Sequence, residues 1–152
     1  MHRKQIGSDG ASRLASIELF AGLSRGQLLM LARVLDEVTA TAGETIMSEG
    51  EPGYEVLVLE EGAAEVLKGG ARVAVMGPGD IFGELAVLDV GGPRTASVIA
   101  TSPLRAMLLT AHFMREVRAQ LPALGERIER VAAERRQRDE QRSSGVRGSA
   151  AP

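Results

Sequence analysis

Regularly spaced turn residues divide the middle of the chain, and this spacing constrains the fold more than any other feature. Between Val38 and Leu109, short runs of β-favouring residues alternate with breaks that contain glycine or proline. The runs are residues 54–59, 63–68, 72–76, 95–100 and 104–109. Several short strands at this spacing favour an antiparallel sandwich or barrel. The sequence Lys68-Gly69-Gly70-Ala71 also predicts a tight hairpin turn.

Helical periodicity flanks this β-rich region on both sides. Ser24 and Gln27 have the spacing of a capping box, which predicts a helix from about residue 25. The apolar residues of that helix recur on one face, at Leu28, Leu31, Ala32 and Leu35. After Thr110 the helical period returns, with one helix over 111–120 and a second that begins near Pro122. We therefore expect one helix before the strands and two after them.

Length and local composition set the expected domain boundaries. The chain has 152 residues, which is enough for one domain with a hydrophobic core and too few for two ordinary domains. Residues 1–12 are polar and predict a flexible arm. Residues 142–152 are rich in Ser, Gly and Ala and predict a disordered tail. The folded domain is expected over residues 13–141.

Composition argues against several classes of site and location. The absence of cysteine removes disulfides, thiolate catalysis and most structural zinc sites. A net charge of −2 lacks the basic footprint of a nucleic-acid-binding domain, so direct DNA binding is not expected. No apolar run approaches the roughly 18 residues that span a bilayer, and no secretory signal follows the charged N-terminus. We expect a cytoplasmic protein without a membrane segment.

Gly83, Glu84 and Arg94 bring three unlike chemical properties into one short segment. Gly83 lets the backbone turn sharply, and a helix that begins there would present unpaired amides to an anion. Arg94 adds a planar fork of donors that matches phosphate oxygens, and Thr95 adds a hydroxyl. Glu84 would repel a phosphate, but its carboxylate suits a donor such as a ribose 2′-OH. Together they predict a site for a ligand with one phosphate and one free sugar hydroxyl.

Taken alone, each charged residue also has an ordinary interpretation. Glu84 can be a glutamate at a helix start, which the helix dipole favours by about 0.3–1 kcal/mol. Arg94 follows a proline and can be an exposed arginine at the entry of a strand. The ligand-site interpretation therefore depends on the coincidence of glycine, carboxylate and guanidinium at this spacing.

The segment Phe82-Gly83-Glu84-Leu85-Ala86, followed by Arg94-Thr95-Ala96-Ser97-Val98, resembles the phosphate-binding cassette of cyclic nucleotide-binding domains. Such domains occur in catabolite activator proteins, kinase regulatory subunits and cyclic-nucleotide-gated channels. The resemblance extends from about residue 15 to about residue 136. It implies a mainly β fold with flanking helices, namely an eight-stranded, antiparallel, jelly-roll-like β-roll with an N-terminal helix and two C-terminal helices.

The resemblance also implies a role for each cassette residue. Glu84 would hold the ribose 2′-OH and Arg94 the cyclic phosphate, with the Thr95 hydroxyl beside it. The phosphate cradle would be completed by the backbone amides of Gly83, Leu85 and Ala86. A hydroxyl residue directly after the arginine implies that cGMP binds as well as cAMP. One departure from the family pattern is Tyr54, which stands where the family often has aspartate.

The base and a lid over it are placed by the same resemblance. Val66, Ala74 and Met76 would form an apolar wall beside the base, and alternation places Ala74 and Met76 on one strand face. Their ordinary alternative is a plain core role. Arg135 continues the apolar stripe of the last helix and would lay its guanidinium over the purine. The alternative for Arg135 is a place in the solvated charged run over residues 134–140.

We interpret the chain as a cyclic nucleotide sensor without catalysis or a cofactor of its own. Binding would draw the C-terminal helix onto the base and so signal to an unidentified effector. The same helix is also a candidate interface for a homodimer. A cupin-type enzyme would need a metal, usually held by several histidines, and the chain has only His2 and His112. The alternative is a β-roll that binds no ligand and serves as a protein-interaction domain.

Overall fold

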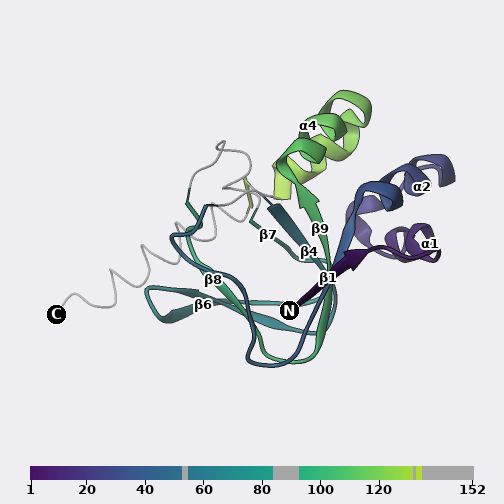
Figure 1. Ribbon diagram of the computed structural model, residues 1–152. Helices are drawn as coiled ribbons and strands as arrows, with labels where there is room; N and C mark the ends of the chain where they lie inside the picture. Colours follow the sequence, from purple (N-terminus) through teal and green to yellow (C-terminus); the bar gives the residue numbers. More distant parts are fainter. Residues whose placement is uncertain (53–54, 84–92, 132, 135–152) are drawn as a thin grey trace.

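The computed structural model describes residues 1–52, 55–83, 93–131 and 133–134, and these residues contain nine strands in two antiparallel sheets (Figure 1). The strands are β1 (His2–Gln5), β2 (Asp36–Ala40), β3 (Thr45–Met47), β4 (Glu55–Glu61), β5 (Ala64–Lys68), β6 (Ala71–Met76), β7 (Ile81–Phe82), β8 (Ser97–Ala100) and β9 (Leu104–Thr110). One sheet has the order β1-β2-β9-β4-β7, and the other has the order β3-β8-β5-β6.

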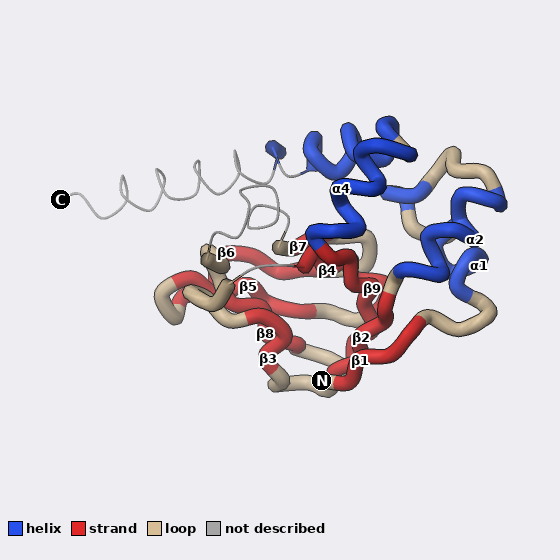
Figure 2. Tube along the Cα trace, turned by 45° about the horizontal axis from the view of Figure 1, so that its top comes forward, coloured by secondary structure: helices blue, strands red, loops and turns tan. Residues whose placement is uncertain are grey.

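The helices lie beside the five-stranded sheet. They are α1 (Gly10–Ala15), the 3-10 helix η1 (Glu18–Phe20), α2 (Arg25–Val34) and α4 (Ala111–Gln120), and residues 122–131 are also helical. Figures 1 and 2 both show them on the side of β4 and β9, with β5, β6 and β8 farther away. Within the described residues, no helix combines the length and the apolar character needed to cross a membrane.

Strands β4 and β9 are buried on both faces because they separate two hydrophobic cores. On β4, Val56 and Val58 pack into the core beneath the helices. The alternate residues Leu57 and Leu59 belong to the core between the two sheets. Strand β9 divides its apolar residues in the same way. The continuous apolar run over residues 56–59 thus reflects burial on both faces rather than on one.

Local sequence signals predicted the hairpin and the capped helix correctly. Strands β5 and β6 pair with Lys68 opposite Ala71. The two glycines between them have φ angles of 59° and 81°, as a type I′ turn requires. At the start of α2, Gln27 N donates to Ser24 Oγ at 3.1 Å, and Ser24 N donates to Gln27 Oε1 at 2.8 Å. These two bonds complete the predicted capping box.

The N-terminal segment differs from the flexible arm predicted over residues 1–12. Strand β1 pairs antiparallel with β2, α1 begins at Gly10, and Ile6 between them is buried. This pairing covers backbone groups of β2 that would otherwise form a sheet edge. All β1 side chains are exposed, so the sequence shows no apolar alternation there. With β1, the described residues contain nine strands instead of the eight predicted.

An ion cluster around the buried Glu37 joins α1 to the five-stranded sheet. Arg13 donates to both carboxylate oxygens of Glu60, from Nε at 2.9 Å and from Nη2 at 2.7 Å. Its Nη2 also lies 2.7 Å from Glu37 Oε2, although not in hydrogen-bond alignment, and Lys4 Nζ lies 3.2 Å from Glu37 Oε1. Burial raises the pKa of Glu37. Arg13 and Lys4 together lower this pKa by more than burial raises it, so it lies below the ordinary value for glutamate.

Candidate functional site

Two predicted site residues, Gly83 and Arg94, contact each other between the end of β7 and the start of β8. Arg94 Nη1 donates a hydrogen bond to the Gly83 carbonyl oxygen at 3.3 Å. Arg94 is only 7% exposed, which excludes the ordinary alternative of an exposed arginine at a strand entry. A buried guanidinium keeps its charge at all physiological pH values, so this position supplies a fixed cation inside the protein.

The backbone of Arg94 is fixed by the turn that precedes β4. Arg94 N donates to the Glu51 carbonyl at 2.8 Å, and Gly50 N donates to the Arg94 carbonyl at 2.9 Å. An isolated antiparallel bridge between Pro52 and Pro93 extends this pairing. Gly50 has a φ of 84°, a left-handed conformation that glycine adopts readily. Hydrogen bonds at both the N–H and the carbonyl of Arg94 thus fix the backbone from which its side chain extends.

Glycine is required at position 83 by both conformation and space. Gly83 has a φ of 92°, in the left-handed region that other residues rarely adopt. A Cβ at this position would collide with Arg94 Nη1 and would lie 2.6 Å from the Glu55 carbonyl oxygen. The sequence predicted a sharp turn at Gly83, and the structure adds that the missing side chain makes room for the arginine.

The structure describes only part of the predicted cassette. Thr95 follows Arg94 and is exposed. Glu84, Leu85 and Ala86 lie outside the described residues, as do the predicted lid residue Arg135 and the tail over 142–152. The contact between Gly83 and Arg94 is therefore the described part of the predicted phosphate site.

The three residues predicted for the base wall lie together on the hairpin of β5 and β6. Val66 is opposite Ala74, and Met76 is opposite Ala64, so alternation places Val66, Ala74 and Met76 on one face. Val66 and Met76 are 3% and 1% exposed and belong to the core between the sheets, whereas Ala74 is partly exposed. Val66 also pairs with Val98 of β8, the strand that follows Arg94. An apolar wall therefore adjoins the strand that leads away from the arginine.

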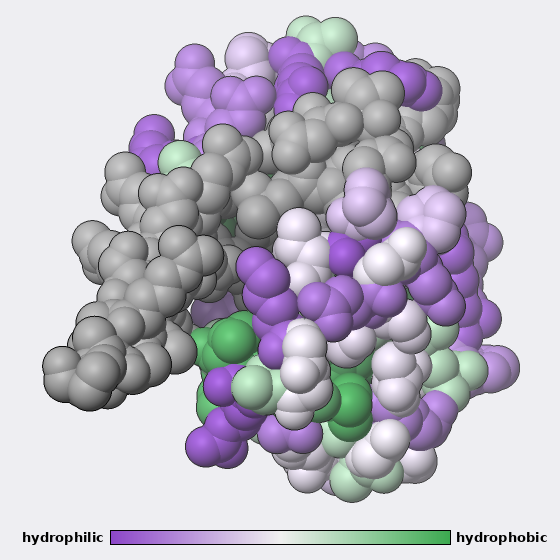
Figure 3. All heavy atoms as spheres, turned by 90° about the vertical axis from the view of Figure 1, so that its left-hand side faces the viewer, coloured by the Kyte–Doolittle hydropathy of each residue, from purple (hydrophilic) through white to green (hydrophobic). Residues whose placement is uncertain are grey.

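The outside of the roll contrasts with this apolar interior. Figure 3 views the molecule from the left-hand side of Figure 1, where β6 and β8 lie. Hydrophilic side chains cover most of the described surface there, and hydrophobic ones show only in small patches. Val75, on β6 between the inward-facing Ala74 and Met76, is 63% exposed. Val75 is thus an apolar side chain on the outer face of the hairpin and an exception to the mainly hydrophilic covering.

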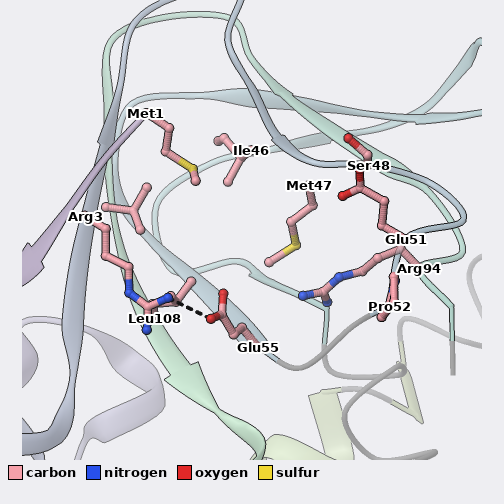
Figure 4. Close-up of a pocket in the computed structure, with 11 residues that line it drawn as sticks. Met1, Arg3, Ile46, Met47, Ser48, Glu51, Pro52, Glu55, Arg94 and Leu108 are labelled. Atoms are coloured by element: carbon pink, nitrogen blue, oxygen red, sulfur yellow. Dashed lines mark hydrogen bonds and ion pairs between the residues drawn. The ribbon is translucent and has the colours of Figure 1, made fainter. Parts of the chain in front are cut away.

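Arg94 also lines a pocket of about 160 Å³ that the sequence did not predict (Figure 4). Its charged lining consists of Arg3, Glu51, Glu55 and Arg94, and Met1 and Met47 contribute apolar surface. Arg3, on β1, pairs with Asp36 from Nε and with Glu55 from Nη1, both at 2.7 Å. The hydrogen bond to Asp36 raises the pKa of Arg3, desolvation offsets part of that rise, and Glu55 raises the pKa again.

Sequence reasoning missed Arg3 and Glu55 because nothing local marks them. Arg3 reaches the pocket only through the pairing of β1 with β2, and β1 carries no periodic apolar signal. Glu55 begins a strand whose other residues are mostly buried, so its polar side chain looked like an ordinary strand end. Only the pairing of β1, which the sequence does not indicate, brings the two residues together.

A family model of the cyclic nucleotide-binding domain matches residues 37–120, which include Gly83, Arg94 and most of the strands around them. The chain belongs to the cyclic nucleotide-binding domain family. Its two antiparallel sheets with flanking helices confirm the predicted fold class of a mainly β roll.

Relatives of this cyclic nucleotide-binding domain occur in proteins with different outputs. A CRP-like cAMP-activated global transcriptional regulator from Mycobacterium tuberculosis (strain CDC 1551 / Oshkosh) is 32% identical over 133 residues, which cover 82% of this chain and 58% of the relative. This chain thus spans somewhat more than half of that regulator. A cyclic nucleotide-binding domain from Methylobacillus flagellatus KT has a TM-score of 0.69 at 25% identity, covering 88% of this chain and 80% of the other.

A second similar structure belongs to an enzyme. A cAMP-binding acyltransferase from Mycobacterium smegmatis has a TM-score of 0.70 at 27% identity, and the match covers 87% of this chain but 42% of the acyltransferase. The cyclic nucleotide-binding domain is therefore similar to part of a regulator and to part of an enzyme.

Proposed function

We propose that this domain is a cyclic nucleotide sensor that binds cAMP, and also cGMP, and has no catalytic activity of its own. The observation that carries the proposal is the buried Arg94 guanidinium packed on Gly83, whose φ and close contacts require glycine. A planar, permanently charged fork just before the start of β8 suits a phosphate, which it can bind through two hydrogen bonds. The family match over residues 37–120 supports a cyclic nucleotide as the source of that phosphate.

The proposed contacts extend beyond the described residues. The backbone amides of Gly83, Leu85 and Ala86 would bind the cyclic phosphate with Arg94, and Glu84 would accept a hydrogen bond from the ribose 2′-OH. The exposed Thr95 hydroxyl would accept a hydrogen bond from the 2-amino group of guanine, which is the reason to expect cGMP binding. We assign these roles from the family resemblance and from the place of Gly83 and Arg94.

The apolar wall on β5 and β6 would cover the base. Ala74 is the partly exposed member of the wall, and Val66 and Met76 support it from the core. Arg135 would close over the other face of the purine as a cation above an aromatic ring. A ligand changes a conformational equilibrium only through different affinities for the two states, so this closure would be the signal.

The terminal helix has a described connection to the start of the domain. Arg127 Nη1 donates to the carbonyl of Leu19 at 3.0 Å and also to that of Ala21, at the end of η1. Movement of the helical residues 122–131 would therefore act on η1 and on the segment before α2. We propose this helix as the output element, with an effector still to be identified.

Titration of the purified chain with cAMP and with cGMP tests the proposal. We expect saturable heat in calorimetry and shifts of the backbone amide resonances of residues 83–86 with both nucleotides. Glu84→Ala should weaken cAMP binding by about 1–3 kcal/mol, because the ribose hydroxyl would lose its acceptor. A folded chain that binds neither nucleotide at saturating concentration would instead favour the protein-interaction domain.

A further inference from the structure

An ion pair from the N-terminal strand lies beside the proposed phosphate site. Arg3 Nη1 is 2.7 Å from Glu55 Oε1, and the side chains of both residues line the same pocket as Arg94. Figure 4 shows the two guanidinium groups and the Glu55 carboxylate projecting into this pocket. The pair thus joins β1 to the first residue of β4 at the pocket that contains the proposed phosphate-binding cation.

Glu55 is close to the phosphate site through its backbone as well. A Cβ built on Gly83 would lie within 3 Å of both the Glu55 carbonyl oxygen and Arg94 Nη1. The start of β4, the glycine turn and the arginine are therefore packed around one point. The backbone of Glu55 therefore lies next to the Arg94 guanidinium, and its side chain lines the same pocket.

We propose that Arg3 is a positioning residue that sets the affinity of the cyclic phosphate site by holding the Glu55 carboxylate. This inference deepens the proposed function and rests on it. A carboxylate that shares a pocket with Arg94 would compete with the phosphate for the Arg94 guanidinium. Arg3 neutralises Glu55 and holds it toward β1, which reduces the competition of this carboxylate with the phosphate.

The expected effect is moderate because the pair is only partly buried. The side chains of Arg3 and Glu55 are 41% and 32% exposed, so water and salt screen their charges in part. Arg3→Gln should therefore weaken cAMP binding about fivefold, the upper range for exposed pairs. Because the effect is electrostatic, it should shrink as the salt concentration rises.

Lys4 provides a matched control on the same strand. Its side chain is 61% exposed and pairs with Glu37 at 3.2 Å, and Lys4 is not among the described residues that line the pocket. Lys4→Gln removes one positive charge from β1, as Arg3→Gln does, without touching Glu55. It should leave the affinity for cAMP as it is in the unchanged protein.

A double-mutant cycle on the full chain tests the inference by calorimetry with cAMP at low and high salt. We expect Arg3→Gln to weaken binding, Glu55→Gln to bind at least as well as the unchanged protein, and the double variant to recover the affinity of Glu55→Gln. Arg3→Lys, which keeps the charge, should stay close to the unchanged protein. If removal of Arg3 only loosened β1, neutralising Glu55 would not rescue binding.

The outcomes separate this inference from the function on which it rests. Binding of cAMP by the unchanged protein together with full affinity in Arg3→Gln overturns the role of Arg3 alone. A double variant as weak as Arg3→Gln overturns it as well. If Arg3→Gln does not fold, Glu55→Gln decides, because a loss of affinity in that variant contradicts competition by the carboxylate. No binding by the unchanged protein overturns the proposed function and this inference with it.

Discussion

The side chains of Arg13 and Arg94 are both largely shielded from solvent, but the structure holds them in different ways. Arg13 lies between the carboxylates of Glu37 and Glu60, which strands β2 and β4 supply. Arg94 has its backbone fixed by the turn over residues 48–52, and its Nη1 donates to the Gly83 carbonyl. Burial alone therefore does not mark a binding site. Carboxylates from the chain itself identify Arg13 as structural, whereas placement against a glycine turn identifies Arg94 as a ligand-binding candidate.

Replacement of Arg94 by alanine should have the largest effect on the affinity for cAMP. We expect the affinity for cAMP to fall by several kcal/mol, about a hundredfold or more, because the partly desolvated phosphate would lose its main cationic partner. Calorimetry measures the affinity, and circular dichroism checks that the variant is folded. A folded Arg94→Ala protein that binds cAMP with full affinity would place the site elsewhere.

Replacement of Arg13 by alanine should lower the stability of the protein and leave its affinity for cAMP largely unchanged. The free energy of unfolding should fall by about 3 kcal/mol, because two buried carboxylates would lose the cation they share. The side chains of Arg13, Glu37 and Glu60 are 12%, 5% and 9% exposed, so water compensates for little of this loss. Urea denaturation measures the change. The comparison fails if Arg13→Ala retains its stability and loses its affinity for cAMP instead.

Short-range signals made much of the fold predictable from the sequence. The Gly69-Gly70 hairpin, the Ser24 capping box and the strand near residues 54–59 depend on neighbours a few residues apart. The motif also drew attention to Gly83 and Arg94, which the structure brings into contact, while the binding roles of the cassette residues stay a prediction.

The missed features depend on contacts between residues far apart in the chain. Arg13 and Glu60 are separated by 47 residues, and Arg3 and Glu55 by 52, so no local pattern relates them. Strand β1 was missed for a different reason. Its side chains are all exposed, and its stability comes from backbone pairing with β2, which does not depend on a particular side-chain pattern.

Two glycines with nearly the same backbone conformation sharpen the comparison at the site itself. Gly83 and Gly79 have φ angles of 92° and 91°, but a Cβ on Gly79 would meet open space among the described residues. Gly83→Ala should lower the free energy of unfolding by about 1–3 kcal/mol and should also weaken cAMP binding, because the new Cβ displaces the Arg94 guanidinium. Gly79→Ala should show the conformational penalty alone. Urea denaturation and calorimetry of both variants separate the two effects, and equal affinities would contradict the role of the glycine in placing Arg94.

The smallest expected effect is a pH dependence of stability. It arises from the ion cluster around Glu37 and not from the binding site. Arg13 and Lys4 hold the pKa of Glu37 below its ordinary value in the folded protein, despite the burial that raises it. The unfolded chain, with an ordinary glutamate pKa of about 4.3, therefore takes up this proton at higher pH than the folded protein does. The stabilising contribution of Glu37 is present above that pH and is lost as the pH falls through the lowered pKa. Urea denaturation at neutral and acidic pH should thus show that the free energy of unfolding falls more steeply as the pH is lowered in the unchanged protein than in Glu37→Gln. If it falls equally in both proteins, Arg13 and Lys4 do not stabilise the charged form of Glu37.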